Sequence, residues 1–173
     1  MKRIIVNILF VLGCFLLQCT LFQSWALANI SPNLLIVFTS SIGFMRGRTE
    51  GLLTGFFSGL LIDICYGQLM GFYALIYMLV GYVNGFFQSI FYDEDLKLPM
   101  ILITVSDFVY GIIIYIFLFM LRNRRDFLYY LLHIIVPEVV YTVVITILLY
   151  RLILIVNRKL EASEKRSAGR GAE

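Results

Sequence analysis

Charged side chains are scarce in this 173-residue sequence. Asp, Glu, Lys and Arg together make up 14% of it, whereas hydrophobic residues make up 61%. Soluble domains contain about 25% charged residues. So few polar side chains could not cover a water-soluble globule of this size, and the mean hydropathy of +0.91 agrees. The composition excludes an ordinary soluble domain and predicts an all-α integral membrane protein.

Residues that carry out catalysis or bind metals are also few. The sequence has one histidine, His133, and three cysteines without paired spacing, Cys14, Cys19 and Cys65. It contains no Ser–His–Asp set, no His/Cys metal motif and no phosphate-binding loop. The cysteines lie in apolar stretches and are expected to act as small hydrophobic residues. The sequence therefore predicts a protein that is not an enzyme and needs no cofactor or metal.

Six apolar stretches divide the sequence, and each is predicted to form one transmembrane helix. A crossing helix needs about 20 apolar residues, so the second and third stretches are short and indicate a locally thin or cavity-lining region. Pro32 lies in the first turn of the second predicted span, and Pro137 predicts a kink in the sixth. The sequence predicts a compact bundle of about six transmembrane helices within residues 1–157, at approximately 4–22, 30–45, 51–66, 69–91, 98–121 and 127–156.

The first stretch has some features of a secretory signal peptide. Lys2 and Arg3 precede it, and Ala26–Leu27–Ala28 resembles a cleavage site. However, the apolar run over 4–22 exceeds the usual signal length of about 7–15 residues and is long enough to span. We expect an uncleaved first helix.

The basic residues are distributed unevenly between the two predicted sides of the membrane. With six spans, both termini share a side, and that side holds all of the fourteen Lys and Arg residues except Arg122, Arg124 and Arg125. The positive-inside rule then predicts a multi-pass protein with six spans and both termini cytoplasmic. The basic residues behind the net charge of +3 are interpreted as orienting the helices, and they do not indicate a nucleic-acid partner. Residues 158–173 are polar and are predicted to form a disordered cytoplasmic tail.

Glycines recur at four-residue spacing, which places them along single helix faces. In lipid no hydrophobic force draws helices together, so small residues permit the close backbone contacts that hold a bundle. Two hypotheses remain open: tight packing within one bundle, or a docking face for a second membrane protein. The residues of interest are Gly51, Gly55, Gly59, Gly67, Gly71 and Gly81, with Gly43, Gly47 and Gly85 in the same pattern.

Three acidic residues, Asp63, Asp107 and Glu138, lie within apolar stretches. An Asp at mid-bilayer costs about 2.5–3.5 kcal/mol on insertion scales, so such a residue normally has a partner or a purpose. No Lys or Arg lies at comparable depth. The expected solution is protonation, or hydrogen bonds to Tyr110, Tyr115, Tyr141, Thr142 or His133. Asp63 is predicted to hold the end of the third span through the turn at Gly67.

The segment over 51–82 resembles the central signature of the rod shape-determining protein MreD family. Members show Gly-Phe, then Gly-Leu-Leu-x-Asp, a glycine turn, and Ala-Leu followed by Val-Gly-Tyr. The matching residues are Gly55-Phe56, Gly59-Leu60-Leu61-Ile62-Asp63, Gly67, Ala74-Leu75 and Val80-Gly81-Tyr82, and Pro32-Asn33-Leu34-Leu35 matches as well. The size, basic start and six-span layout agree.

This resemblance implies a non-catalytic subunit of the bacterial cell-elongation machinery, located in the bacterial plasma (inner) membrane and supporting lateral peptidoglycan synthesis and cell shape. The partners that it implies are a single-span protein of the MreC type and, indirectly, an MreB-like filament and a peptidoglycan polymerase/transpeptidase pair. It also implies a fold resembling the substrate-binding subunit of energy-coupling-factor transporters.

The alternative hypothesis is a substrate-binding membrane subunit of a small-molecule, vitamin-type transporter. Aromatic residues crowd the third and fourth predicted spans, and together with the buried acids they could line a ligand pocket. Lipid-facing and interfacial packing is the simpler interpretation of the same residues. They are Phe56, Phe57, Phe72, Tyr73, Tyr77, Tyr82, Phe86 and Phe87.

Overall fold

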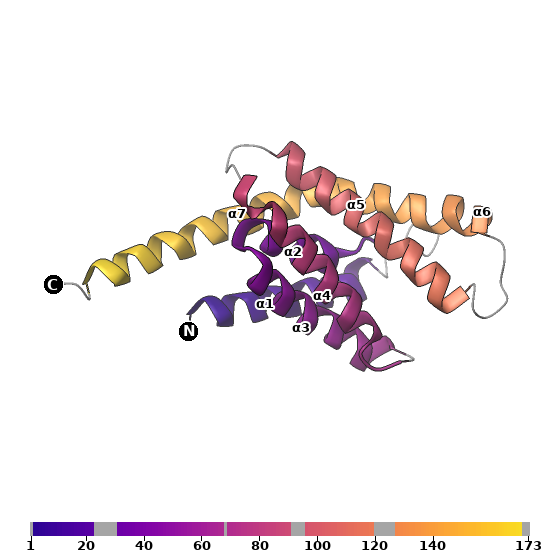
Figure 1. Cartoon of the computed structure of the whole chain (residues 1–173), viewed down its shortest axis with the longest axis horizontal. Helices are drawn as coiled ribbons and strands as arrows, with labels where there is room; N and C mark the ends of the chain where they lie inside the picture. Colours follow the sequence, from indigo (N-terminus) through magenta and orange to yellow (C-terminus); the bar gives the residue numbers. More distant parts are fainter. Residues whose placement is uncertain (1, 23–30, 68, 91–95, 120–126, 171–173) are drawn as a thin grey trace.

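The computed structural model describes residues 2–22, 31–67, 69–90, 96–119 and 127–170, and in this part of the chain it is all-helical (Figure 1). Helices α6 and α7 follow each other in one direction along the long axis of the molecule, and α5 runs beside them. The elements are α1 (Lys2–Leu17) with a π-helical turn (Gln18–Phe22), α2 (Leu34–Arg46), α3 (Arg48–Tyr66), α4 (Phe72–Asn84) with a 3-10 turn (Gly85–Ile90), α5 (Lys97–Ile114) with a π-helical turn (Tyr115–Phe119), α6 (Phe127–Tyr130), a further π-helical turn (Leu131–Ile135) and α7 (Val136–Arg170).

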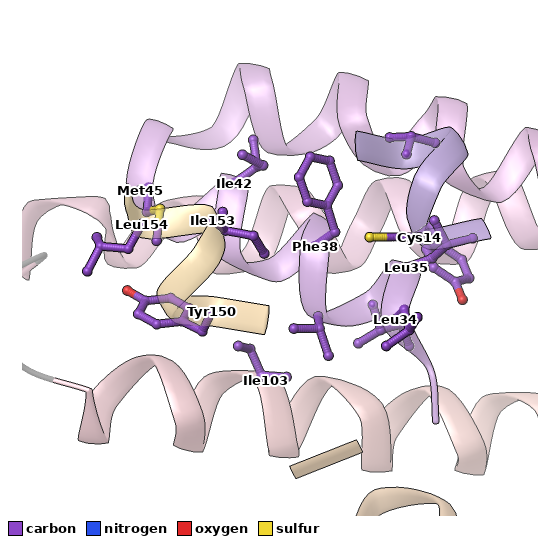
Figure 2. Packing of buried hydrophobic residues seen from close by; sticks show 14 of the residues in the cluster. Cys14, Leu34, Leu35, Phe38, Ile42, Met45, Ile103, Tyr150, Ile153 and Leu154 are labelled. Carbon is purple, nitrogen blue, oxygen red and sulfur yellow. The ribbon is translucent and has the colours of Figure 1, made fainter. Parts of the chain in front are cut away.

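Helix α2 is the centre of the bundle, and every residue from Leu34 to Met45 is buried. Its sequence has no charged residue before Arg46, so it presents no face that favours water. Helices α1, α3, α4, α5 and α7 all pack against it. Phe38 stacks on Phe10 of α1 with ring centroids 5.5 Å apart, while Ile103 of α5 and Tyr150 of α7 lie on other sides of the same core (Figure 2).

The outer faces of the surrounding helices are apolar. Large side chains such as Leu9 of α1, Phe57 of α3 and Val105 of α5 are exposed, and Leu148 of α7 is 75% exposed. Surfaces of this kind belong in lipid rather than water. Four helical segments are long and apolar enough to cross a membrane: Arg3–Thr20, Phe72–Ile90, Lys97–Phe117 and Phe127–Ala162. They coincide with the first, fourth, fifth and sixth predicted spans.

The second and third predicted spans are also helical, but they are not among these four segments. Helix α2 has 13 residues, which corresponds to about 20 Å at 1.5 Å per residue. The hydrocarbon core is about 30 Å thick. Helix α2 is therefore shorter than the hydrocarbon core is thick.

Two interruptions occur where the sequence contains Pro or Gly. The predicted sixth span is divided into α6, a π-helical turn and α7, and the turn ends just before Pro137. Proline has no N–H to donate, so the hydrogen-bond pattern of the helix changes near Pro137, whereas the kink itself stays a prediction. Helix α4 begins at Phe72 rather than at the predicted residue 69, because Gly71 has a left-handed backbone conformation (φ +93°).

Helix α7 continues to Arg170, whereas the sequence predicts a disordered tail from residue 158. Glu161 stabilises the first turn of this extension: its carboxylate accepts a 3.3 Å hydrogen bond from Asn157 Nδ2 and lies 3.5 Å from Arg46 Nη1. The treatment of residues 158–173 as a separate cytoplasmic tail stays a prediction. The basic segment over 122–125 lies outside the described residues.

Candidate functional site

The glycines of α3 lie directly against the backbone of α4. A Cβ placed on Gly59 would lie 2.5 Å from Ala74 Cα, and one placed on Gly55 would overlap the carbonyl of Tyr77. Gly51 and Gly81 face each other in the same way. Glycines four residues apart on α3 therefore lie against residues of α4 that are also four residues apart. We call this contact, formed by Gly51, Gly55, Gly59 and Gly81, the glycine seam.

Two further glycines extend the seam to neighbouring elements. A Cβ on Gly43 of α2 would lie 2.5 Å from Gly81 O, and one on Gly85 would lie 2.5 Å from Arg48 Cα at the start of α3. Three helices thus meet backbone to backbone around Gly43, Gly51 and Gly81. All of these contacts are made within the chain, so the geometry matches the internal-packing hypothesis for these glycines.

Gly67 and Gly71 have other surroundings. Gly67 ends α3, where its N–H donates to Asp63 O at 3.0 Å, and a Cβ there would meet the backbone of Asp63. A Cβ on Gly71 would meet no atom within 4 Å. Its left-handed backbone conformation, which side chains disfavour, is the feature that calls for glycine. The structure therefore places Gly71 in a turn and not in a helix contact.

Asp63 joins the end of α3 to the start of α4. Its buried carboxylate accepts hydrogen bonds from Gly71 N (3.1 Å), Tyr73 N (3.0 Å) and Ala74 N (2.9 Å). The first amides of a helix have no partner inside that helix, and a negative charge interacts favourably with its positive end. The Asp63 side chain thus reaches beyond the predicted turn at Gly67 to satisfy the first turn of α4.

A second group of buried polar side chains surrounds the start of α2. Tyr77 of α4 donates from its hydroxyl to Asn33 Oδ1 at 2.7 Å, and Asn33 N donates to Thr142 Oγ1 of α7 at 3.1 Å. Asn33 Oδ1 also accepts from Ile36 N at 3.3 Å, which caps α2. These bonds provide partners for polar groups at the buried start of α2. We use the name intramembrane polar cluster for five residues: Asn33, Tyr77, Asp107, Glu138 and Thr142.

Asp107 of α5 and Glu138 of α7 meet in this cluster. Asp107 is 2% exposed, and Glu138 is half-buried and interacts electrostatically with it. Thr142 is the neighbouring hydroxyl of Asp107. Of the other partners proposed from the sequence, His133 is exposed and stacks on Tyr129, and Tyr115 packs on Phe127 and Tyr130.

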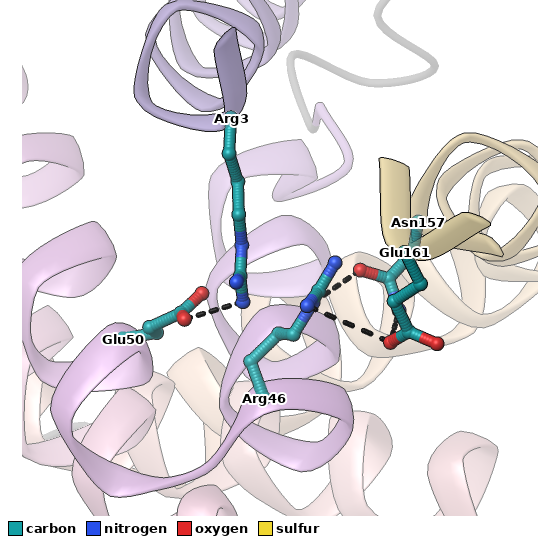
Figure 3. Close-up of polar contacts among 5 residues, drawn as sticks. All are labelled: Arg3, Arg46, Glu50, Asn157 and Glu161. Atoms are coloured by element: carbon teal, nitrogen blue, oxygen red, sulfur yellow. Dashed lines mark hydrogen bonds and ion pairs between the residues drawn. The ribbon is translucent and has the colours of Figure 1, made fainter. Parts of the chain in front are cut away.

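Polar contacts at the opposite end of α2 link four helices (Figure 3). Arg3 of α1 pairs with Glu50 of α3. Arg46 of α2 donates to Asn157 Oδ1 of α7 and lies near Glu161. These contacts place the start of α1 and the polar part of α7 at the same end of the molecule.

The aromatic residues of α3 and α4 do not gather around one cavity. Tyr77 is buried against Tyr110 and Asn33, Phe57 faces outward, and Phe86 packs under the Arg48 guanidinium. Within the described part of the chain, the structure shows a cavity of about 10 Å³ between α1, α2 and α7, which is room for one water. Small-molecule pockets occupy about 300–1,000 Å³, so nothing here favours the transporter hypothesis.

The family described as rod shape-determining protein MreD matches residues 1–160. The chain belongs to the MreD family. It is therefore a rod shape-determining, multi-pass membrane protein of a non-catalytic family, as the resemblance of the segment over 51–82 implied. No curated protein and no solved structure matches the chain. The likeness to the substrate-binding subunit of energy-coupling-factor transporters stays a prediction.

Two residues of these sites were not singled out from the MreD-like sequence as polar contacts. Asn33 connects α2 to Tyr77 of α4 and Thr142 of α7, and Asn84 of α4 donates to Ser106 of α5 at 2.8 Å. In the sequence, each of these residues is recognisable only as a polar side chain inside an apolar stretch. Such a side chain must find a partner in lipid, but the sequence does not show on which helix that partner lies.

We expect Gly55→Ala to destabilise the protein. Alanine normally favours a helix over glycine by about 1 kcal/mol, but at this position its methyl group would overlap the Tyr77 carbonyl. The matched control is Gly13→Ala in α1, where a Cβ meets no atom within 4 Å. Thermal unfolding in mild detergent should show a lower midpoint for Gly55→Ala and an unchanged or higher one for Gly13→Ala. Equal effects of both substitutions would contradict the seam.

Replacing Asp63 with alanine should also destabilise the fold. The substitution leaves three amides at the start of α4 without their acceptor, and each buried unsatisfied group costs about 1–3 kcal/mol. Cys65→Ala, two residues further along α3 at an exposed position, is the control. Hydrogen exchange should accelerate selectively at the first turn of α4 in Asp63→Ala. Unchanged protection there would show that the carboxylate does not cap α4.

Proposed function

We propose that this protein is a scaffold subunit of the bacterial cell-elongation complex, docking inside the membrane with a single-span protein of the MreC type. Through that partner it supports lateral peptidoglycan synthesis, indirectly with an MreB-like filament and a peptidoglycan polymerase/transpeptidase pair. The observation that carries the proposal is the family match over residues 1–160.

The surface chemistry supports docking through helix faces. The glycine seam is used within the chain, and the intramembrane polar cluster is enclosed by α2, α4, α5 and α7. The exposed parts of the long helices are apolar side chains, including Leu9, Phe57, Val105 and Leu148. A partner helix in the membrane would therefore contact such a face through packing, because lipid leaves no hydrophobic driving force between helices.

The proposed topology has six crossings, with both termini in the cytoplasm. Arg3, Arg46 and Arg158 belong to the end of the molecule where α1 starts and the polar part of α7 lies. A basic end of this kind is retained on the cytoplasmic side. Helix α2 completes its short crossing with the aid of the Asn33 cap, since irregular backbone at membrane depth is tolerated where protein buries it.

The proposal predicts specific copurification with an MreC-type partner from the same genome, after coexpression and extraction in mild detergent. An unrelated single-span protein is the control for nonspecific association. Photocrosslinking residues placed singly at Leu9, Phe57, Val105 and Leu148 should then capture the partner from one helix face. The same crosslinker at buried Tyr77 should capture none.

Failure of the two proteins to copurify would contradict the proposal. So would equal crosslinking from every exposed helix face, because random collisions in the micelle would produce that pattern.

A further inference from the structure

The Asp107 carboxylate is a buried group without a normal partner. Its side chain lies near the middle of α5 and is 2% exposed. Thr142 is its neighbouring hydroxyl, yet neither carboxylate oxygen forms a hydrogen bond of normal geometry with a residue that the structure describes. An unsatisfied polar group in a membrane interior costs several kcal/mol. An ionised one costs more, so this carboxylate requires an explanation.

No described cation lies at the depth of Asp107. Lys97, at the start of α5, is ten residues away, or about 15 Å along the helix. Arg151 is nine residues beyond Thr142 on α7, about 13 Å along that helix, and is exposed. His133 is exposed on the π-helical turn before α7. The carboxylate is thus not neutralised by a described basic side chain.

The titratable groups around Asp107 do not supply positive charge. Glu138 of α7 is a second carboxyl, and Tyr77 of α4 interacts with both acids. Tyr73 of α4, Tyr110 of α5 and Tyr130 of α6 face Glu138, and α2 contributes the uncharged Asn33. Two ionised carboxylates in such surroundings would repel each other and would both be poorly solvated.

We propose that Asp107 is a proton-binding site inside the membrane. The carboxylate takes one proton from water and becomes a neutral acid with one O–H donor. The Thr142 hydroxyl accepts from Asn33 N and lies beside this acid, so it can exchange a hydrogen bond with the neutral carboxyl. Asp107 of α5 is thereby linked through Thr142 of α7 to the start of α2.

The charge of this acid makes helix packing depend on the proton. With the proton bound, α5, α7 and the Asn33 cap are connected by uncharged groups. Without it, a negative charge remains beside Glu138 and loosens the contact of α5 with α7. A metal cation is a poorer occupant, because the described residues offer two carboxyls here and no cluster of three or more His, Cys, Asp or Glu. The proton site does not depend on the proposed docking with an MreC-type partner.

Infrared spectroscopy of the purified protein in lipid nanodiscs tests the site. The wild type should show the carbonyl band of a neutral carboxylic acid at neutral pH, shifted in D₂O. Asp107→Asn should lose this band, because the amide keeps the shape of the acid but has no carboxyl group. Glu50→Gln, which changes an acid paired with Arg3 at the end of the molecule, should keep it.

A titration of the wild type keeps the proposal testable if Asp107→Asn does not fold. The band should disappear reversibly as the pH is raised, and the unfolding midpoint should fall with it. Absence of the band at neutral pH, or its loss in Glu138→Gln but not in Asp107→Asn, would overturn the assignment to Asp107. Stabilisation of the wild type by Na⁺ but not by choline at constant pH would also overturn it, in favour of a metal cation.

Discussion

The contact between the backbones of α3 and α4 is the interaction on which the remaining structure depends. Apolar side chains gain little free energy when they leave lipid for a contact between helices. Helices in a membrane are therefore held together by close packing and by polar contacts. Gly51, Gly55 and Gly59 remove the side chains that would separate the two helices. Asp63 then caps the start of α4, because its carboxylate accepts hydrogen bonds from the first amides of that helix. The seam and the cap act on the same pair of helices and favour the same register.

Helix α2 is placed by this pair and organises the other helices. Gly43 lies against Gly81 at the seam, while the other sides of α2 contact α1, α5 and α7. A short helix that begins inside a membrane leaves amides that lipid cannot satisfy. Asn33, Tyr77 and Thr142 form the polar connections at that end. Family membership identifies the biological process, and these contacts explain how a chain with so little polar surface maintains one defined shape.

The sequence predicted the parts of the fold that repeat along a single helix. Glycine spacing indicated the face of α3 that packs closely, and Pro137 indicated the break before α7. Hydropathy found the four long spans but not the limits of α2 and α4. Asn33 marks the start of α2 through its side-chain cap, and Gly71 marks the start of α4 through its left-handed backbone. The cluster around Asp107 was only partly predictable. The acids of this cluster are recognisable because they lie in apolar stretches of the sequence. Their neighbours come from α4 and α7, and the sequence does not show that these helices lie beside α5 in the folded bundle.

The central claim is that α2, α3 and α4 meet closely in the intact protein, and a disulfide crosslink tests it most directly. Thr39 Oγ1 of α2 and Ser58 Oγ of α3 are buried and 3.5 Å apart, so cysteines at both positions would have adjacent sulfur atoms. In a background without Cys14, Cys19 and Cys65, mild oxidation should join Thr39→Cys to Ser58→Cys rapidly. The control pair of Thr39→Cys and Leu53→Cys, with Leu53 exposed on α3, should remain reduced. A folded Thr39/Ser58 pair that does not crosslink, or a control that crosslinks equally, would contradict the account.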